Sequence, residues 1–466
     1  MVVQSFVFVP LVGLLAFMMA RRGLGSHERR FIAYAFLAHV VGSISLVLYH
    51  EYIFRGGDMY LYTGFGRELA AFMRTDFVRN APDVVNLTLQ RESHLPMEVL
   101  LEGTSTATMM GLTAFAMLVF GDSIYAVCLA FSFFSFVGTA SIYKAVRFKL
   151  DVVERTPVLV GVLLVPSVVF WSSGIVKEAV VVGALGGVLN GISEALVRKR
   201  IAALIAMVPA AGLMMLTKPY VFVPLVLGIG AWFYAGRGNK LGLGYKLIGT
   251  AIAIGGLVAV SRMFPAYGFD RVAETIAHTQ RNFAQTEAGS GVQVGDLDTD
   301  LEDQTLAGSL KWAPLGLLNA VARPMPFDVR NLALAIAAIE MTALLWIVSS
   351  LVRRHGVGRV LTAVSAHPPY LFSAVFVLAL GTSVGLATGN LGSLSRYRVP
   401  MMPMYVGMVL ALRARLNAPV KKRLPVGTAA LDASKEVLTA SAARPRGAEL
   451  RSKLARSSKR GRPTGL

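Results

Sequence analysis

Long apolar runs separated by short charged linkers constrain this chain more than any other feature. The runs lie near residues 4–20, 31–49, 123–145, 157–171, 176–196, 201–216, 219–235, 244–262, 330–352, 368–387 and 400–416. A helix needs about 20 apolar residues to cross a hydrocarbon core of about 30 Å, and several runs approach that length. Only 16% of the 466 residues are charged, against about 25% in soluble proteins. The sequence therefore predicts an all-α, polytopic membrane helical bundle of about 11 transmembrane helices.

A twelfth apolar run, residues 107–120, is too short for a full span and predicts an interfacial helix. When it is left out of the count, the basic linkers all fall on one face of the membrane, from Arg21 in the first linker to Arg423 in the last. Linkers rich in Lys and Arg stay in the cytoplasm, which predicts an outer N-terminus and a cytoplasmic C-terminus. We therefore expect a multi-pass protein of an inner (cytoplasmic) membrane, with long outer loops at 50–122 and 263–329.

The positive charge of the chain is concentrated behind the last apolar run. Residues 417–466 contain twelve Lys or Arg and three Asp or Glu, so they carry nine of the nineteen net positive charges. This placement favours a membrane domain, 1–416, followed by a basic disordered cytoplasmic tail, 417–466. We expect the bilayer as the main partner, anionic lipid as the partner of the tail, and no nucleic acid.

Asp58 stands just outside the second apolar run, after two glycines whose backbone can bend closely around a ligand. One interpretation is a catalytic base or a metal-coordinating carboxylate at the outer surface. The other is an N-cap, because Asp commonly precedes a helix. Tyr62 and Arg67 follow at spacings that share a helix face, so we expect them to support Asp58.

Lys177 and Glu178 open an apolar run directly after a Ser-Ser-Gly turn, and Lys218 and Tyr220 lie in a hairpin between two further runs. Both lysines are candidates for binding phosphate through three N–H donors. Helix capping and snorkelling at the membrane interface explain the same residues without a function.

Arg396 and Arg398 flank Tyr397 on the expected outer face, where arginine runs against the positive-inside tendency. Guanidinium groups match phosphate oxygens bidentately, so the pair predicts a phosphate contact. Arg323, a further candidate for binding the departing phosphate, precedes a proline-rich approach to a later run. Glu340, a candidate supporting residue, lies about ten residues inside that run, where a carboxylate faces the bundle interior or a cavity.

The sequence does not support a calcium loop, a nucleotide-binding motif or a serine nucleophile. The acidic run at 296–303 alternates like a calcium loop but has Leu301 where such a loop requires glycine, so a solvated loop is expected. No Walker loop, dinucleotide fingerprint or serine nucleophile elbow is present.

Several short motifs resemble the GT-C superfamily of membrane glycosyltransferases, which take sugars from polyprenyl-phosphate carriers on the outer face. They are Gly57-Asp58 to Tyr62, Leu118 to Asp122, Ile142-Tyr143-Lys144, the acid after Pro166 to Gly174, and Arg396 to Pro403. The chain departs from the family in having Glu178 where Asp is commoner. It also lacks the usual double proline near residues 94–98 and has an extra span before the key loop. It is similar as well to membrane proteins of bacterial polysaccharide clusters, including polymerases.

The resemblance implies a glycosyltransferase that moves sugar from a polyprenyl-(pyro)phosphate carrier to a glycan or lipid acceptor. It implies that Asp58 is the base or metal-linked carboxylate, that Glu178 is a second acid, and that Arg396 and Arg398 contact the carrier phosphate. The cofactor is left open, with a divalent metal ion as one candidate. The alternative is a transporter or flippase of lipid-linked oligosaccharide, and transferase and polymerase both stay open.

Overall fold

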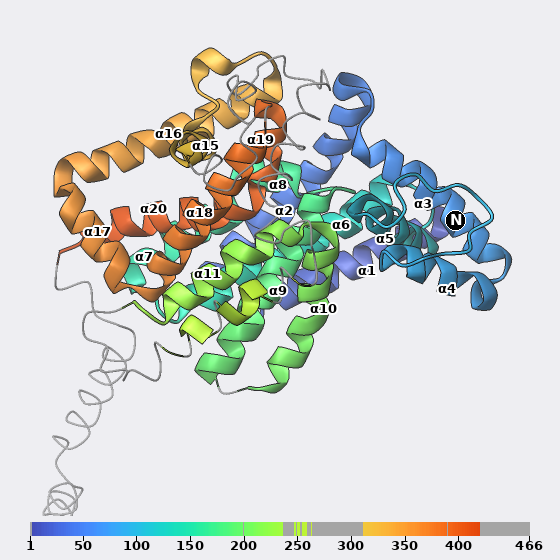
Figure 1. Ribbon diagram of the computed structural model, residues 1–466, viewed down its shortest axis with the longest axis horizontal. Coiled ribbons are helices and arrows are strands. Elements are labelled where there is room, and N and C mark those ends of the chain that lie inside the picture. The colour runs from blue at the N-terminus through green and yellow to red at the C-terminus, as the bar shows by residue number, and fades with distance from the viewer. Residues whose placement is uncertain are drawn as a thin grey trace, which may run out of the picture.

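The computed structural model describes residues 2–198, 200–235, 311–388, 390–419 and a few positions between 247 and 262. These residues are mostly helical and contain no strand, which confirms the expected all-α class. The helices are α1 (Val2–Arg21), α2 (Ser26–Leu48), the π-helix η1 (Tyr49–Phe54), α3 (Asp58–Thr75), α4 (Phe77–Thr88), α5 (Ser105–Phe120), α6 (Ile124–Arg147), α7 (Val152–Leu163), α8 (Pro166–Trp171), α9 (Lys177–Arg198), α10 (Ala202–Thr217), η2 (Pro219–Val221), α11 (Phe222–Trp232), α15 (Ala313–Ala322), η4 (Pro326–Asp328), α16 (Leu332–His355), α17 (Val357–Ala366), α18 (Pro368–Ala387), α19 (Leu391–Tyr397), η5 (Val399–Met401) and α20 (Met402–Asn417) (Figure 1).

Within the described residues, five helical stretches are long and apolar enough to cross a membrane. They are α1, α2 with η1, α6, α16 and α18, and the bent pair α10–α11 makes a sixth if it is counted as one span. These helices indicate a membrane-embedded bundle, while the count of eleven spans stays a prediction. The expected tail after residue 419 and the acidic run at 296–303 lie outside the described residues, as do most of the apolar run at 244–262 and of the second outer loop.

Prolines mark two breaks between helices, one inside a run that was expected to be a single helix and one between two runs that were expected to be separate. The run expected at 157–171 divides into α7, which ends at Leu163, and α8, which begins at Pro166. The chain bends by 120° between α10 and α11, where Pro219 follows Lys218. Proline has no backbone N–H and disfavours helical conformation in the residue before it, so each break falls where the sequence places a proline.

The helices enclose two hydrophobic cores. Helices α3, α4 and α5 pack together at one side of the molecule around residues such as Met73 and Leu87 (Figure 1). The larger core lies between α6, α7, α9, α18 and α20. Helices α6 and α9 approach so closely that a Cβ on Gly186 would lie 2.0 Å from the carbonyl oxygen of Gly138. Small residues allow such close contact, and here they fix the middle of α9 against α6.

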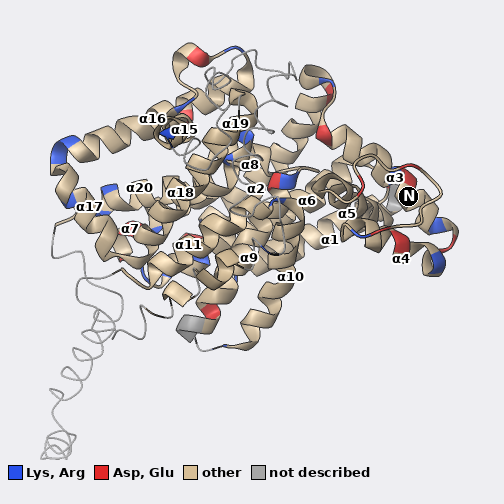
Figure 2. Cartoon of the chain, viewed as in Figure 1, with Lys and Arg blue, Asp and Glu red and all other residues tan. Residues whose placement is uncertain are grey.

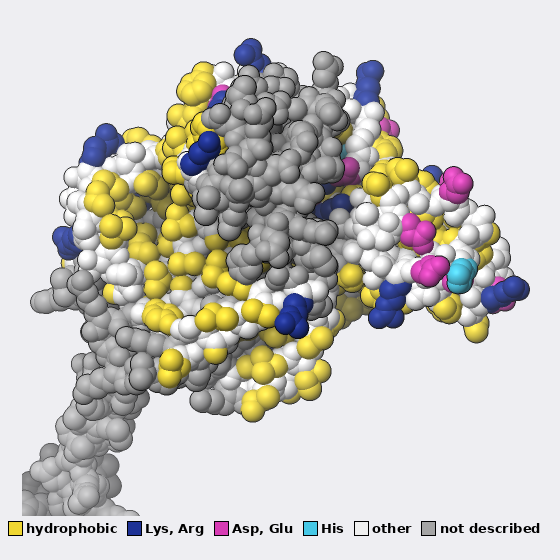
Figure 3. All heavy atoms as spheres, in the orientation of Figure 1, with side chains coloured by type: hydrophobic (Ala, Val, Ile, Leu, Met, Phe, Trp, Pro, Cys, Tyr) yellow, Lys and Arg dark blue, Asp and Glu magenta, His cyan; other side chains and the backbone are white. Residues whose placement is uncertain are grey.

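The surface agrees with a membrane environment. Charged residues lie mainly at helix ends and in connections, and most of the bundle is uncharged (Figure 2). Large apolar side chains are exposed along α1, α2 and α16, among them Phe6, Leu37 and Ile339. Figure 3 shows broad hydrophobic areas over the bundle, whereas acidic side chains gather over α3–α5. We infer that the apolar belt faces lipid.

Candidate functional site

The candidate site is built around Glu178, in the first turn of α9. The turn at Ser172–Gly174 brings the chain into this helix, and Glu178 is 0% exposed. The free N–H groups at the start of a helix favour negative charge, which suits a carboxylate here. Because an unpaired charge at such depth would be strongly unfavourable, Glu178 requires cations beside it.

Two cations from distant helices meet the Glu178 carboxylate. Lys218, buried at the break between α10 and α11, has its Nζ 2.7 Å from Glu178 Oε1. Arg396, in the last turn of α19, has its Nε 2.9 Å from Oε2. The Arg396 contact is a close ion pair rather than a well-aligned hydrogen bond, since neither atom has a hydrogen-bond partner of good geometry. Burial alone would lower the pKa of Arg396, but the carboxylates of Glu178 and Asp58 outweigh it and raise this pKa.

Asp58 joins the same arginine from the other side. Its Oδ2 lies 2.9 Å from Arg396 Nη2, and its side chain is 45% exposed. Gly57, not Asp58, occupies the N-cap position of α3, with a φ of 90° that favours glycine. A Cβ on Gly57 would also lie 2.5 Å from the Phe54 ring. The structure therefore separates the two interpretations of Asp58: its carboxylate contacts Arg396, and glycine provides the cap.

Lys177 lies beside this group without an ion pair of its own among the described contacts. Its Nζ donates to Ser105 Oγ at 2.9 Å and to Thr106 Oγ1 at 3.2 Å, both in the first turn of α5. The ammonium also lies 6.0 Å from the ring centre of Tyr62, which is buried. Burial, with the negative charge of Asp58 as the next cause, raises the pKa of Tyr62, so this tyrosine stays neutral.

We call Asp58, Lys177, Glu178, Lys218 and Arg396 the Arg396 cluster. Two aromatic rings flank this cluster. The Nζ of Lys218 lies 4.4 Å from the ring centre of Tyr397 and 5.8 Å from that of Tyr220. Three cations face two carboxylates, so the cluster carries one surplus positive charge. Such a group is suited to bind an anion at its exposed side, next to Asp58.

Arg398 does not join the cluster. It is 0% exposed and donates from Nη1 to the carbonyl oxygens of Arg323 and, at 3.4 Å, of Ala320. Its side chain thus ties the end of α19 to the end of α15, and the expected contact with a carrier phosphate is not accessible. Arg396 and Arg398 were predicted to act as a pair, but they have different roles in the fold.

Three further expected site residues have other partners. Arg323 pairs with Asp328 at 2.5 Å, and this contact is the main cause that lowers the pKa of Asp328. Arg67 is exposed and donates to the Asp122 carbonyl at 3.4 Å, at the end of α5. Glu340 accepts hydrogen bonds from the backbone N–H of Ser167 at 2.9 Å and from its hydroxyl at 2.7 Å. Glu340 therefore caps the start of α8 from a neighbouring helix.

A metal ion finds no suitable ligands in the described part of the chain. No group of three His, Cys, Asp or Glu residues there is placed to hold one. The two carboxylates of the cluster are instead joined by the Arg396 guanidinium. The residues present do not fit the divalent metal that was considered at Asp58.

Sequence reasoning missed the residues that hold Lys177 in place and that join α5 to the end of α10. Ser105 and Thr106 look like ordinary capping residues before an apolar run, and nothing in their spacing links them to Lys177, some seventy positions later. Gln90 donates to Thr108 at 2.9 Å and to the Leu216 carbonyl at 2.6 Å, next to Lys218. These contacts join segments that are distant in sequence, so only a folded chain reveals them.

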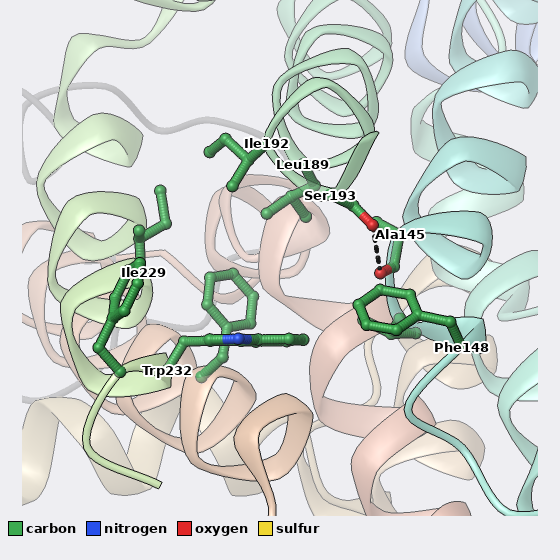
Figure 4. Close-up of a pocket in the computed structure, with 10 residues that line it drawn as sticks. Ala145, Phe148, Leu189, Ile192, Ser193, Ile229 and Trp232 are labelled. Atoms are coloured by element: carbon green, nitrogen blue, oxygen red, sulfur yellow. Dashed lines mark hydrogen bonds between the residues drawn. The ribbon is translucent and has the colours of Figure 1, made fainter. Parts of the chain in front are cut away.

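An apolar hollow lies apart from the cluster, between α6, α9, α11 and α18 (Figure 4). Trp232 and Phe148 line it, and its one polar contact is the Ser193 hydroxyl, which donates to the Ala145 carbonyl at 3.0 Å. With no charged group in its lining, the hollow offers nothing to hold an anion.

No family model, curated protein or solved structure matches this chain. Its function is therefore inferred from its own residues.

Proposed function

We propose that the protein is a membrane glycosyltransferase that moves a sugar from a polyprenyl-(pyro)phosphate carrier to a glycan or lipid acceptor on the extracytoplasmic face, in the synthesis of cell-surface polysaccharide. The observation that carries this proposal is the surplus of cations beside one exposed carboxylate. Cations stabilise the charge that develops on a departing phosphate, and an exposed carboxylate accepts a proton from an acceptor hydroxyl. An apolar belt around the bundle suits a substrate with a polyprenyl tail.

The proposed reaction is a substitution at the anomeric carbon. Asp58 takes the proton of the acceptor hydroxyl, whose oxygen forms the new glycosidic bond. The bond between the anomeric carbon and the phosphate oxygen breaks, and its electron pair leaves with the phosphate. Arg396 and Lys177 stabilise that charge. Atoms and charge balance without a metal or a redox partner.

Glu178 has a supporting role in this proposal. It is 0% exposed, and both of its oxygens lie beside cations, so it does not reach a substrate. It holds Lys218 and Arg396 in place and is a positioning residue rather than a second catalytic acid.

Replacing Asp58 tests the proposal. In protein reconstituted with polyprenyl-linked sugars, Asp58→Asn should lower the release of free polyprenyl phosphate by about 100-fold or more, because the base is lost. Asp122→Asn is the matched control, since Asp122 pairs with Arg74 at 2.8 Å outside the cluster. Full activity of a folded Asp58→Asn protein would refute the transferase.

One observation favours the alternative, a transporter or flippase of lipid-linked oligosaccharide. The bent α10–α11 pair carries buried Lys218 at its break, and transporters bind substrates at discontinuous helices. Movement of a fluorescent lipid-linked sugar across a proteoliposome, with no transfer of its sugar, would support this alternative.

A further inference from the structure

The Arg396 cluster holds its exposed acid in an ion pair. A general base needs a free lone pair directed at the proton that it takes. Asp58 has one oxygen only 2.9 Å from the Arg396 guanidinium. Without a substrate, the carboxylate that the proposed reaction requires is therefore engaged by a cation.

The two carboxylates on Arg396 are not equivalent. Glu178 is enclosed and has Lys218 as a second cation at 2.7 Å. Asp58 is 45% exposed, and Arg396 is its one ion-pair partner among the described residues. Solvent screens exposed ion pairs, and their median contribution is about 0–1 kcal/mol. Of the two ion pairs that Arg396 forms, the one with Asp58 is thus the one that an arriving anion displaces more readily.

We propose that the Asp58–Arg396 ion pair is an exchangeable latch: the phosphate of the carrier lipid takes the place of the Asp58 carboxylate on Arg396 and releases Asp58 to act as the base. This inference rests on the proposed transferase function. Phosphate and carboxylate compete for the same guanidinium edge, and phosphate presents more oxygens to it. Lys177, held by two hydroxyls and by no carboxylate, provides a second anchor for the phosphate.

The latch imposes an order on the two substrates. The carrier lipid binds first, because its phosphate frees Asp58, and the acceptor hydroxyl is activated second. Glu178 stays in place throughout and keeps Arg396 oriented. In the absence of carrier, Arg396 holds one oxygen of Asp58, which lowers the availability of this carboxylate to water and other hydroxyls.

Carboxylate labelling tests the exchange on the full chain in lipid nanodiscs. Asp58 is labelled with a water-soluble carbodiimide and an amine, and the product is quantified by peptide mass spectrometry. Addition of polyprenyl monophosphate should raise Asp58 labelling about two- to fivefold, the factor expected on release from an exposed ion pair. Polyprenol of the same length, which lacks the phosphate, should leave it unchanged. Inorganic phosphate serves as a third arm. An equal rise in Asp58 labelling with inorganic phosphate would assign the site to free phosphate and overturn the proposal that the carrier lipid displaces Asp58.

Asp122 is the internal control for labelling. It also pairs with an arginine, Arg74, and its side chain is 22% exposed. Its labelling should not respond to polyprenyl monophosphate. Arg396→Gln should raise the labelling of Asp58 without lipid and remove the response to lipid, whereas Arg74→Gln should raise only that of Asp122. The comparison of the two lipids on the unaltered protein needs no variant, so it decides the matter even if Arg396→Gln does not fold.

Native mass spectrometry of the same nanodiscs separates the two proposals. If polyprenyl monophosphate binds and Asp58 labelling stays constant or falls, the latch is wrong and the transferase stands. If the lipid does not bind at all, both proposals are wrong.

Discussion

Two arginines near opposite ends of α20 each lie between two carboxylates. Arg396 precedes the helix and contacts Asp58 and Glu178. Arg415 lies in its last turn, 3.3 Å from Asp151 Oδ2 and 3.0 Å from Glu154 Oε1. At 1.5 Å per residue, a helix of this length separates them by roughly 25 Å. We call Asp151, Glu154, Tyr370 and Arg415 the Arg415 cluster.

The carboxylates of the two clusters differ in origin. Asp151 and Glu154 form the capping box of α7, so both come from one helix start. Glu154 also accepts hydrogen bonds from the Asp151 backbone at 2.7 Å and from the Tyr370 hydroxyl. The acids of the Arg396 cluster come instead from α3 and α9, and one is exposed. An arginine between two acids is thus not a site in itself; surplus cations and an exposed acid distinguish the candidate site from a structural cap.

The largest expected effect comes from removing the buried acid of each cluster. Glu178→Ala should lower the free energy of unfolding by about 3–5 kcal/mol, because it leaves Lys218 as a buried unpaired charge and Arg396 with only the half-exposed Asp58 as a partner. Glu154→Ala should cost about 1–3 kcal/mol, since it loses hydrogen bonds but leaves Arg415 28% exposed. Denaturation of the detergent-solubilised variants measures both. A larger loss for Glu154→Ala would contradict the distinction between the clusters.

A smaller effect is expected on lipid affinity. Lys177→Met should weaken the binding of polyprenyl monophosphate about tenfold, because it removes one charged donor. The free energy of unfolding of the Lys177→Met protein should change little, since Lys177 contacts two hydroxyls and no acid. Lys149→Met is the matched control near the Arg415 cluster and should bind lipid normally. Equal weakening by both variants would mean that binding follows total charge rather than this cluster.

The smallest effects come from the aromatic neighbours. Tyr370→Phe should lose about 1 kcal/mol of stability with its hydrogen bond to Glu154, and transferase activity should be unchanged. Tyr397→Leu should lose a cation–π contact with Lys218 of about 1–2 kcal/mol, together with part of the activity. Denaturation and sugar-transfer assays on both variants check this difference. Loss of activity in Tyr370→Phe would show that the Arg415 cluster also serves the reaction.

The helical class and several helix ends follow from local sequence. The apolar runs predict helices, and Pro166 and Pro219 mark the breaks that the structure contains. Lys177 and Glu178 at the start of α9 and Lys218 at the second break were recognisable candidates because charges are unfavourable next to lipid. Arg396, on the expected outer face and therefore against the positive-inside tendency, drew attention to the segment whose arginine contacts Asp58 and Glu178. These inferences need only neighbouring residues and the properties of a bilayer.

Only the tertiary structure decided which candidates meet. Asp58, Glu178, Lys218 and Arg396 come from four parts of the chain, and packing of α3, α9 and α19 brings them together. Arg396 and Arg398 are identical in type and nearly adjacent, yet one joins the cluster and the other binds carbonyl oxygens behind it. Successive residues on a helix are rotated by about 100°, so side chains two positions apart point in almost opposite directions. The sequence determined that arginines stand here, and the packing of α19 against α8, α16 and α18 determined which of them faces the acids.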